Sequence, residues 1–193
     1  MKKVIFASKN EGKIREVNHI LKDLDISIVS LSDMPEHFEI VEDGKSFEEN
    51  ALIKARKVFE KFNIPAIADD SGLTVEQLKG APGIFSARYA GENADDAANN
   101  KKLLQELKKF PEPHKAKFVC AAVYYDGKET TTVTGNFEGK IIDKARGKNG
   151  FGYDPLFVPD GYSVTSAELD QDVKNRISHR YNAFIALKDI LGR

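Results

Sequence analysis

Near its start the chain carries the stretch VIFASKNEGKIREVNHILKDL, residues 4–24. Its first four residues are apolar and predict a short buried strand. From Glu11 to Leu24 apolar residues recur at helical spacing and predict a helix that begins soon after that strand. A strand followed at once by a helix is the repeating unit of α/β folds.

The rest of the chain first repeats this alternation and then changes it. The expected elements are, in order, a strand at 26–31, a helix at 46–62 capped by Ser46, a strand at 66–68, a helix at 94–110, a hairpin over 118–142 that turns at Asp126, and a helix at 173–191. Early strands alternate with helices and later strands form a hairpin. We therefore expect an α/β fold with a mixed central sheet flanked by helices.

Composition narrows the class of protein. A chain of 193 residues with 41% hydrophobic and 31% charged residues is long enough for one globular domain with a buried core. Its 29 basic and 30 acidic residues give a net charge of −1, which argues against a protein that coats nucleic acid. A single cysteine excludes an intrachain disulfide and a cysteine zinc cluster. With no signal segment and no apolar run of membrane-spanning length, we expect a cytoplasmic protein with no membrane partner.

The segment between the first strand and the first helix is a candidate phosphate site. It consists of Ser8, Lys9, Asn10, Glu11, Gly12 and Lys13. A helix N-terminus offers unpaired N–H groups to a phosphate, and Lys13 adds a positive charge. The segment is not a Walker A loop, which needs glycine in place of Ala7 and serine or threonine in place of Ile14. The alternative is a polar helix cap with solvated lysines.

Two adjacent carboxylates, Asp69 and Asp70, follow the predicted strand at 66–68 and precede Ser71 and Gly72. Neighbouring side chains on an extended chain point to opposite sides, so the two carboxylates should play different parts. One of them could hold Mg²⁺ or activate a water, with Glu42 or Glu49 as the second carboxylate. The alternative is a simple turn.

Two further segments could contact a ligand. In residues 147–155, glycines flank Phe151 and Tyr153, which suits stacking of a flat ring, although both aromatics could pack on the core instead. Lys174, His179 and Arg180 provide a cluster of donors that could bind an anion or a ketone oxygen on a base. The alternative for this cluster is a solvated helix face.

These motifs together resemble one family. Its strings appear here in order as Ser8-x-Asn10-x-Gly12-Lys13, Glu48-Glu49-Asn50-Ala51, Asp69-Asp70-Ser71-Gly72-Leu73, Gly80-Ala81-Pro82-Gly83 with Ser86-Ala87-Arg88-Tyr89, Gly150-Phe151-Gly152-Tyr153-Asp154-Pro155 and Ser178-His179-Arg180. The chain resembles the inosine triphosphate pyrophosphatases, which act on non-canonical purine nucleoside triphosphates. The likeness runs from the first strand to the last helix.

The resemblance implies a single domain over residues 1–193, with an elongated mixed sheet and two lobes around an active-site cleft. It implies a homodimer that requires Mg²⁺ and hydrolyses XTP, ITP and dITP to the monophosphate and pyrophosphate. Asp70 matches the proton acceptor and metal ligand of the family, and Glu42 matches its second metal ligand. The implied substrate contacts are Ser8, Lys9, Asn10, Glu11, Gly12, Lys13, Ser71, Phe151, Gly152, Tyr153, Asp154, Lys174, His179 and Arg180.

Two other functions are weighed against this one. A pyrophosphatase for pyrimidine or other modified nucleotides, as in the related Maf-like group, would share the general architecture, but the strings at 151–154 and 178–180 favour purines. A nucleotide sensor or nucleic-acid-binding module without turnover is disfavoured by the near-neutral charge and the paired carboxylates.

Overall fold

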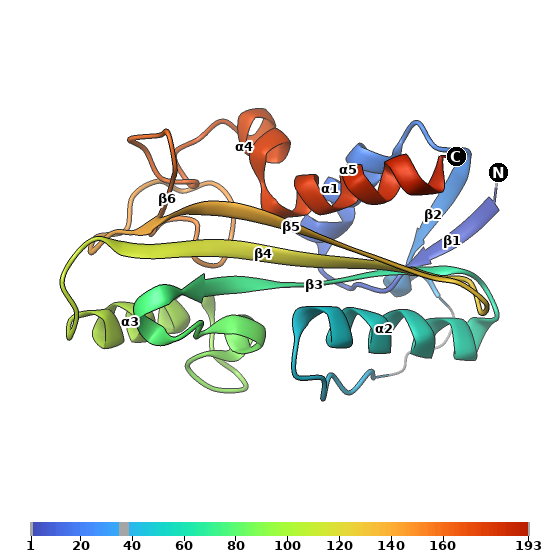
Figure 1. Cartoon of the computed structure of the whole chain (residues 1–193), viewed down its shortest axis with the longest axis horizontal. Coiled ribbons are helices and arrows are strands. Elements are labelled where there is room, and N and C mark those ends of the chain that lie inside the picture. Colours follow the sequence, from blue (N-terminus) through green and yellow to red (C-terminus); the bar gives the residue numbers. More distant parts are fainter. Residues whose placement is uncertain (1, 35–38, 193) are drawn as a thin grey trace. The chain divides into compact units, whose positions relative to one another are not determined.

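The fold is built on one mixed β-sheet with helices on its faces (Figure 1). The computed structural model describes residues 2–34 and 39–192, and across them six strands pair in the order β2-β1-β3-β4-β5-β6. The strands are β1 (Lys2–Phe6), β2 (Ile26–Ser30), β3 (Ala66–Val75), β4 (His114–Tyr125), β5 (Thr130–Ile141) and β6 (Phe157–Pro159). The helices are α1 (Glu11–Leu21), α2 (Phe47–Phe62), α3 (Asp96–Leu107), α4 (Gln171–Ile177) and α5 (His179–Leu191). Because β1 is parallel to β2 and β3 while β5 and β6 are antiparallel, the predicted mixed α/β sheet is confirmed.

The chain divides into two compact units. Unit 1 comprises Met1–Asp70, Cys120–Gly135 and His179–Arg193, and unit 2 comprises Ser71–Val119 and Asn136–Ser178. Strands β3, β4 and β5 each contribute residues to both units.

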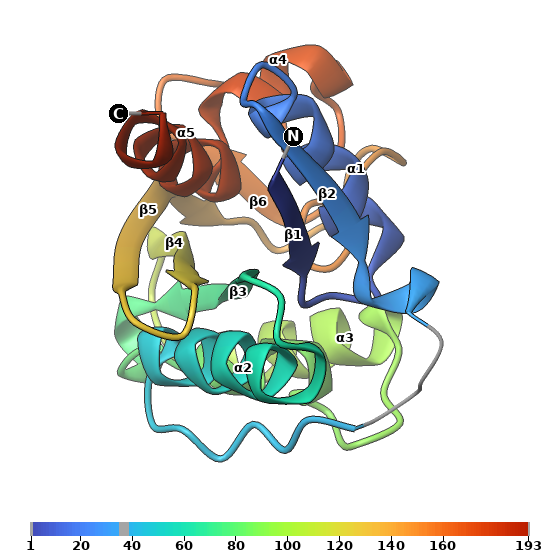
Figure 2. The ribbon, with the colours of Figure 1, turned by 90° about the vertical axis from the view of Figure 1, so that its right-hand side faces the viewer.

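In unit 1, three helices cover the two faces of the sheet (Figure 2). Helices α1 and α5 lie side by side on one face, and α2 lies on the opposite face. The core between the sheet and the α1–α5 pair contains Phe6 and Phe184, whose rings meet edge to face with centroids 5.9 Å apart. The first helix starts where Asn10 caps it, since the Asn10 side chain accepts the N–H of Lys13.

Unit 2 has a core of its own. It joins Leu73 of β3, Leu103 of α3, Phe118 of β4 and Phe157 of β6, and the rings of Phe118 and Phe157 lie 4.8 Å apart between centroids. Helix α3 begins at Asp95, whose side chain accepts the N–H of Ala98. Helix α3 therefore begins at a fixed residue, and the side chains of its first turn are in place to bind neighbouring loops.

The predicted hairpin is confirmed, and its first strand, β4, begins four residues earlier than expected. Only residues 126–129 connect β4 to β5, and neighbouring strands joined by so short a link must be antiparallel. At the turn, the Asp126 carboxylate accepts the N–H groups of Lys128 and Glu129 at 3.0 and 2.9 Å. Gly127 has a φ of 93°, which a residue with a side chain rarely adopts.

Two expectations about elements were wrong. Strand β3 does not end before Asp69 but continues to Val75, so the paired carboxylates lie within a strand rather than after it. The predicted helix at 173–191 is two helices, broken at Ser178, whose backbone is extended with φ −69° and ψ 156°. The break has a physical reason, because Ile177 packs against the core of unit 2 whereas Phe184 belongs to the core of unit 1.

Candidate active site

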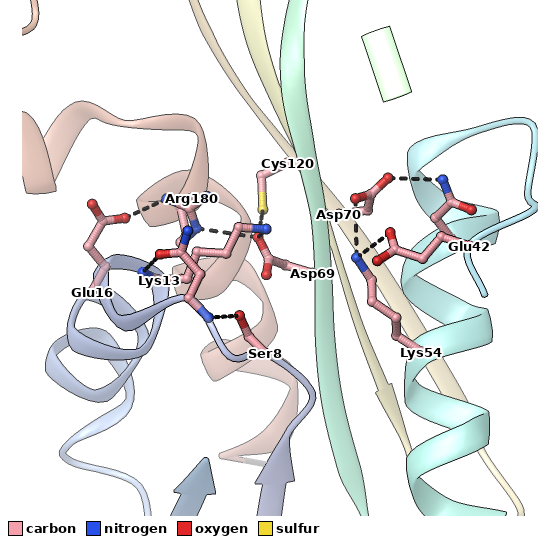
Figure 3. A network of polar contacts seen from close by, with 11 residues as sticks. Ser8, Lys13, Glu16, Glu42, Lys54, Asp69, Asp70, Cys120 and Arg180 are labelled. Atoms are coloured by element: carbon pink, nitrogen blue, oxygen red, sulfur yellow. Dashed lines mark hydrogen bonds and ion pairs between the residues drawn. The ribbon is translucent and has the colours of Figure 1, made fainter. Parts of the chain in front are cut away.

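The paired carboxylates of β3 point away from each other. Asp69 and Asp70 are both buried, at 2% and 8% exposure. Figure 3 shows them projecting from opposite sides of β3, each into a separate group of polar side chains. The prediction that neighbouring carboxylates on an extended chain play different parts is consistent with this geometry.

On one side of the strand, Asp70 is held by helix α2. Its Oδ1 accepts from Lys54 Nζ at 3.1 Å, and its Oδ2 accepts from Asn50 Nδ2 at 3.2 Å. Lys54 Nζ also donates to Glu42 Oε2 at 2.9 Å. The side-chain oxygen Oδ1 of Asn50 accepts the N–H of Gly44 at 2.9 Å, which fastens the segment before α2.

The sequence analysis missed the importance of Asn50 and Lys54. Both are buried, at 2% and 7% exposure, and lie on the face of α2 that also buries Ala51 and Ala55. Burying a lysine among alanines on a helix face costs free energy unless a carboxylate pairs with its ammonium group. That mismatch between a charged residue and an apolar helix face was the available signal.

Burial and charge set the protonation of this group. Burial raises the pKa of Asp70 above its ordinary value, although the nearby charges of Lys54 and Lys13 offset part of that rise. Burial alone would lower the pKa of Lys54, but the carboxylates of Asp70, Asp69 and Glu42 outweigh it and raise that pKa. Asp70 is therefore a stronger base than an ordinary aspartate, and Lys54 stays charged.

The same two carboxylates suit a divalent cation. Asp70 and Glu42 both reach one positive group, the Lys54 ammonium, so they converge on a single point. In the part of the chain that the structure describes, no cluster of three or more His, Cys, Asp and Glu side chains could hold a metal ion. Mg²⁺ commonly uses only one or two protein carboxylates and takes its other ligands from water and substrate phosphates, so the residues present fit it.

On the other side of the strand, Asp69 anchors two cations. Its Oδ2 lies 2.9 Å from Lys13 Nζ and 3.3 Å from Arg180 Nε. Arg180 also donates through Nη1 to Glu16 Oε2 at 2.6 Å, and the Cys120 thiol lies 3.8 Å from Asp69 Oδ2 (Figure 3). Burial alone would lower the pKa of the Arg180 guanidinium, but the charges of Asp69 and Glu16 outweigh the effect of burial and raise that pKa. This buried network ties α1, β3 and α5 together.

The predicted phosphate segment begins after β1 and continues into α1, since Ser8, Lys9 and Asn10 precede the helix and residues 11–13 form its first turn. Lys9, Asn10 and Glu11 are exposed, and Ser8 Oγ accepts the N–H of Asn10 at 3.2 Å. Lys13 reaches inward to Asp69 rather than outward to solvent. His179 is buried at the first position of α5, next to Arg180. Within unit 1 the predicted residues therefore fall into two groups: Lys13 and Arg180 meet at Asp69, whereas Glu42 and Asp70 meet at Lys54 on the opposite side of β3.

Unit 2 brings together the predicted residues of the glycine-rich segment. Lys174 Nζ lies 2.5 Å from Asp154 Oδ2, which also accepts the N–H of Phe151 at 2.9 Å. The Phe151 ring is 40% exposed, with Lys174 Nζ 5.4 Å from its centroid. Tyr153 differs from it, because its side chain is buried in the core of unit 2 and its hydroxyl donates to the Ser86 carbonyl at 2.8 Å. Phe151 is thus the ring of this pair that can stack on a ligand.

Ser71 follows Asp70 directly on β3 and is the first residue of unit 2. It is half-buried, and the neighbouring Gly72 and Leu73 are buried. Its predicted contact with substrate stays a prediction, as do those of the other segments.

Comparison with known proteins identifies the family. The sequence model of the Ham1 family matches residues 4–190. This chain belongs to the Ham1 family. A Ham1-family structure, that of a HAM1 protein from Coxiella burnetii, has a TM-score of 0.93 at 40% identity and covers 99% of this chain and 98% of that one. The α/β fold predicted from the sequence is therefore also the fold of a solved family member.

Named relatives of the Ham1-family chain are similar over their whole length. A dITP/XTP pyrophosphatase of Oceanobacillus iheyensis is 49% identical over 191 residues, which is 97% of each chain. A dITP/XTP pyrophosphatase of Geobacter sulfurreducens is 48% identical over 194 aligned positions and covers 100% of this chain and 98% of the relative. No helix within residues 2–34 and 39–192 is long and apolar enough to cross a membrane.

Proposed function

We propose that this chain is a nucleoside-triphosphate pyrophosphatase that hydrolyses dITP, XTP and ITP to the monophosphate and pyrophosphate, and so removes deaminated purines from the nucleotide pool. One observation carries the proposal: a buried Asp70 of raised pKa, oriented by Asn50 and sharing the Lys54 ammonium with Glu42. The names of relatives that are 48–49% identical over full length support the substrate class.

The proposed chemistry is hydrolysis at the α-phosphorus. Asp70 accepts a proton from a water molecule as that water attacks in line, and pyrophosphate leaves with the electron pair of the broken P–O bond. Asn50 and Lys54 fix the orientation of the Asp70 carboxylate, so that the base does not rotate away from the water. Lys13 neutralises part of the polyphosphate charge, and fixed charge of this kind is usually the largest contribution to catalysis.

Mg²⁺ is the proposed cofactor, held by Asp70 and Glu42. When bound, it neutralises phosphate charge and lowers the pKa of a coordinated water. A substrate that brings its own phosphate ligands would complete the coordination that two protein carboxylates leave open.

Selection of the base is assigned to donors of His179 and Arg180. Hypoxanthine and xanthine present a 6-keto acceptor, whereas adenine presents a 6-amino donor that would clash with protein donors. A site built to hydrogen-bond one group can reject the analogue by about 10⁴–10⁵. In this structure Asp69 and Glu16 bind the Arg180 guanidinium. The two carboxylates therefore already fix the orientation of the group that is proposed to contact the base.

We also propose a homodimer and a cytoplasmic location, both on the resemblance to the inosine triphosphate pyrophosphatases. The oligomeric state is tested by light scattering of the purified protein. A monomer across micromolar concentrations would contradict the proposed dimer and leave the proposed chemistry standing.

The proposed activity is tested by pyrophosphate release from ITP, XTP, GTP, ATP and dUTP, each with Mg²⁺ and with EDTA. We expect release from ITP and XTP in Mg²⁺, little from ATP, and none in EDTA. Preference for dUTP would indicate a pyrimidine pyrophosphatase. Binding of ITP without any release would indicate a nucleotide sensor.

A further inference from the structure

The exposed ring of Phe151 stands on a glycine-flanked loop, in which the Phe151 N–H donates to Asp154 but the neighbouring glycines leave the backbone free to move. Phe151 lies between Gly150 and Gly152, whose φ values are 76° and 63°. Glycine residues have the largest backbone freedom of any residue, and ordering them costs the most conformational entropy. A ring that must stack on a base is useful only if something holds this loop before the ligand arrives.

Helix α3 holds the loop through both backbone polar groups of one residue, Gly152. Asp96 Oδ2 accepts the N–H of Gly152 at 2.7 Å, and Asn100 Nδ2 donates to the carbonyl of Gly152 at 2.9 Å. The two residues lie one turn apart on α3, so their side chains project from the same face of the helix. All of these contacts lie within unit 2.

We propose that Asp96 and Asn100 are positioning residues, which set the Phe151 ring for stacking on the purine by clamping the backbone N–H and C=O of Gly152. The proposal rests on the proposed function, because it deepens the role of Phe151 there. Neither residue touches the reacting atoms in this scheme. Both act through the loop, so their loss weakens recognition of the base and leaves the phosphate chemistry intact.

The chemistry of the clamp predicts opposite results for two isosteric changes. Asp96→Asn keeps an oxygen that can accept the Gly152 N–H, so we expect a KM near that of the wild type. Asn100→Asp replaces the donor by a carboxylate facing the Gly152 carbonyl, so we expect a loss as large as that of Asn100→Ala. The other side-chain oxygen of Asn100, Oδ1, is buried and has no hydrogen-bond partner among the described residues. The amide therefore holds the loop through Nδ2.

The main test measures kcat and KM for ITP in Asp96→Ala and Asn100→Ala. A stacked base contributes enough binding free energy that losing its platform should raise KM by about 5-fold to 140-fold. We expect an increase toward the lower end of that range and a kcat within about twofold of the wild type, because the lost contact is made equally before and during the reaction. Inhibition by inorganic triphosphate, which has no base, should not change.

The neighbouring Asn99 offers a matched control. Its side chain clamps a different loop in the same way, accepting from Ala90 N–H at 2.8 Å and donating to the Ala87 carbonyl at 3.1 Å. Asn99→Ala removes an equivalent pair of bonds from the same helix and should leave the KM for ITP unchanged in the folded protein. Thermal unfolding of each variant separates lost stability from lost positioning.

A double mutant decides whether the clamp acts through Phe151. In a Phe151→Ala background, Asn100→Ala should add little to the increase in KM, because the ring that it positions is gone. Independent, multiplying effects would overturn the proposal, and so would unchanged KM values in both alanine variants of an active enzyme. Failure of the wild type to hydrolyse ITP would instead overturn the proposed function and this inference with it.

Discussion

Arg180→Met should destabilise the protein by a large and specific amount. Arg180 is 2% exposed, and its guanidinium donates to Glu16 at 2.6 Å and to Asp69 at 3.3 Å. Removing one partner of a buried ion pair costs about 3–5 kcal/mol, because the remaining charge stays buried. Asp69 keeps Lys13 at 2.9 Å whereas Glu16 loses the guanidinium, so we expect the lower part of that range, about 3–4 kcal/mol.

This loss corresponds to a fall in Tm of about 6–16 °C for a chain of this size. Urea and thermal unfolding followed by circular dichroism, without nucleotide, measure it free of any contribution from substrate binding. The control is Lys188→Met on the same helix, which removes one ion pair to Asp23, a residue whose side chain is 65% exposed. An exposed pair of this kind contributes about 0–1 kcal/mol. If both variants lost the same small amount of stability, the argument that Arg180 supports the buried network would be refuted.

Three further substitutions test the catalytic group. Asp70→Asn should lower kcat by at least about 10², because the proposed general base is lost, and the variant should still fold, because Glu42 keeps the Lys54 ammonium paired. In the wild type, kcat/KM should fall as the pH drops through the raised pKa of Asp70, and Lys54→Met should move this acid limb to higher pH, because a charge that lowers the pKa of Asp70 is removed. Lys13→Ala should raise the KM for ITP and GTP alike, because a phosphate contact does not depend on the base.

Each of these has a result that contradicts it. Near-normal turnover of Asp70→Asn would remove Asp70 from its role as proton acceptor. An acid limb that stays in place, or moves to lower pH, in Lys54→Met would show that another group controls the profile. A Lys13→Ala variant that changes only the ratio of ITP to ATP hydrolysis would show that Lys13 contacts the base rather than the phosphates.

Elements fixed by local signals were predictable from the sequence. The strand at residues 4–7 and the start of α1 at Glu11 follow from an apolar run and from apolar residues at helical spacing, and both elements are in the structure. The cap of α2 at Ser46 and the turn at Asp126 are of the same kind. In each case the interacting residues lie within four positions of one another, so the local sequence is enough to predict the element.

Features that depend on distant partners were not predictable. Strand β3 passes through Asp69 and Asp70, which local propensity assigns to a turn, because Lys13 and Lys54 from two different helices neutralise the two buried carboxylates. The break at Ser178 was equally hidden, since the apolar spacing on either side suits one continuous helix. Two separate cores, rather than a local breaker, decide where α4 ends.

The position of Lys54 between Glu42 and Asp70 has a consequence for the protein in the absence of the proposed Mg²⁺. Two neighbouring carboxylates repel one another when no cation lies between them. In this structure the Lys54 ammonium lies 2.9 Å from Glu42 Oε2 and 3.1 Å from Asp70 Oδ1, so it neutralises the repulsion between the two carboxylates. We therefore expect removal of Mg²⁺ to abolish activity without unfolding the protein, and addition of Mg²⁺ to restore activity without a refolding step.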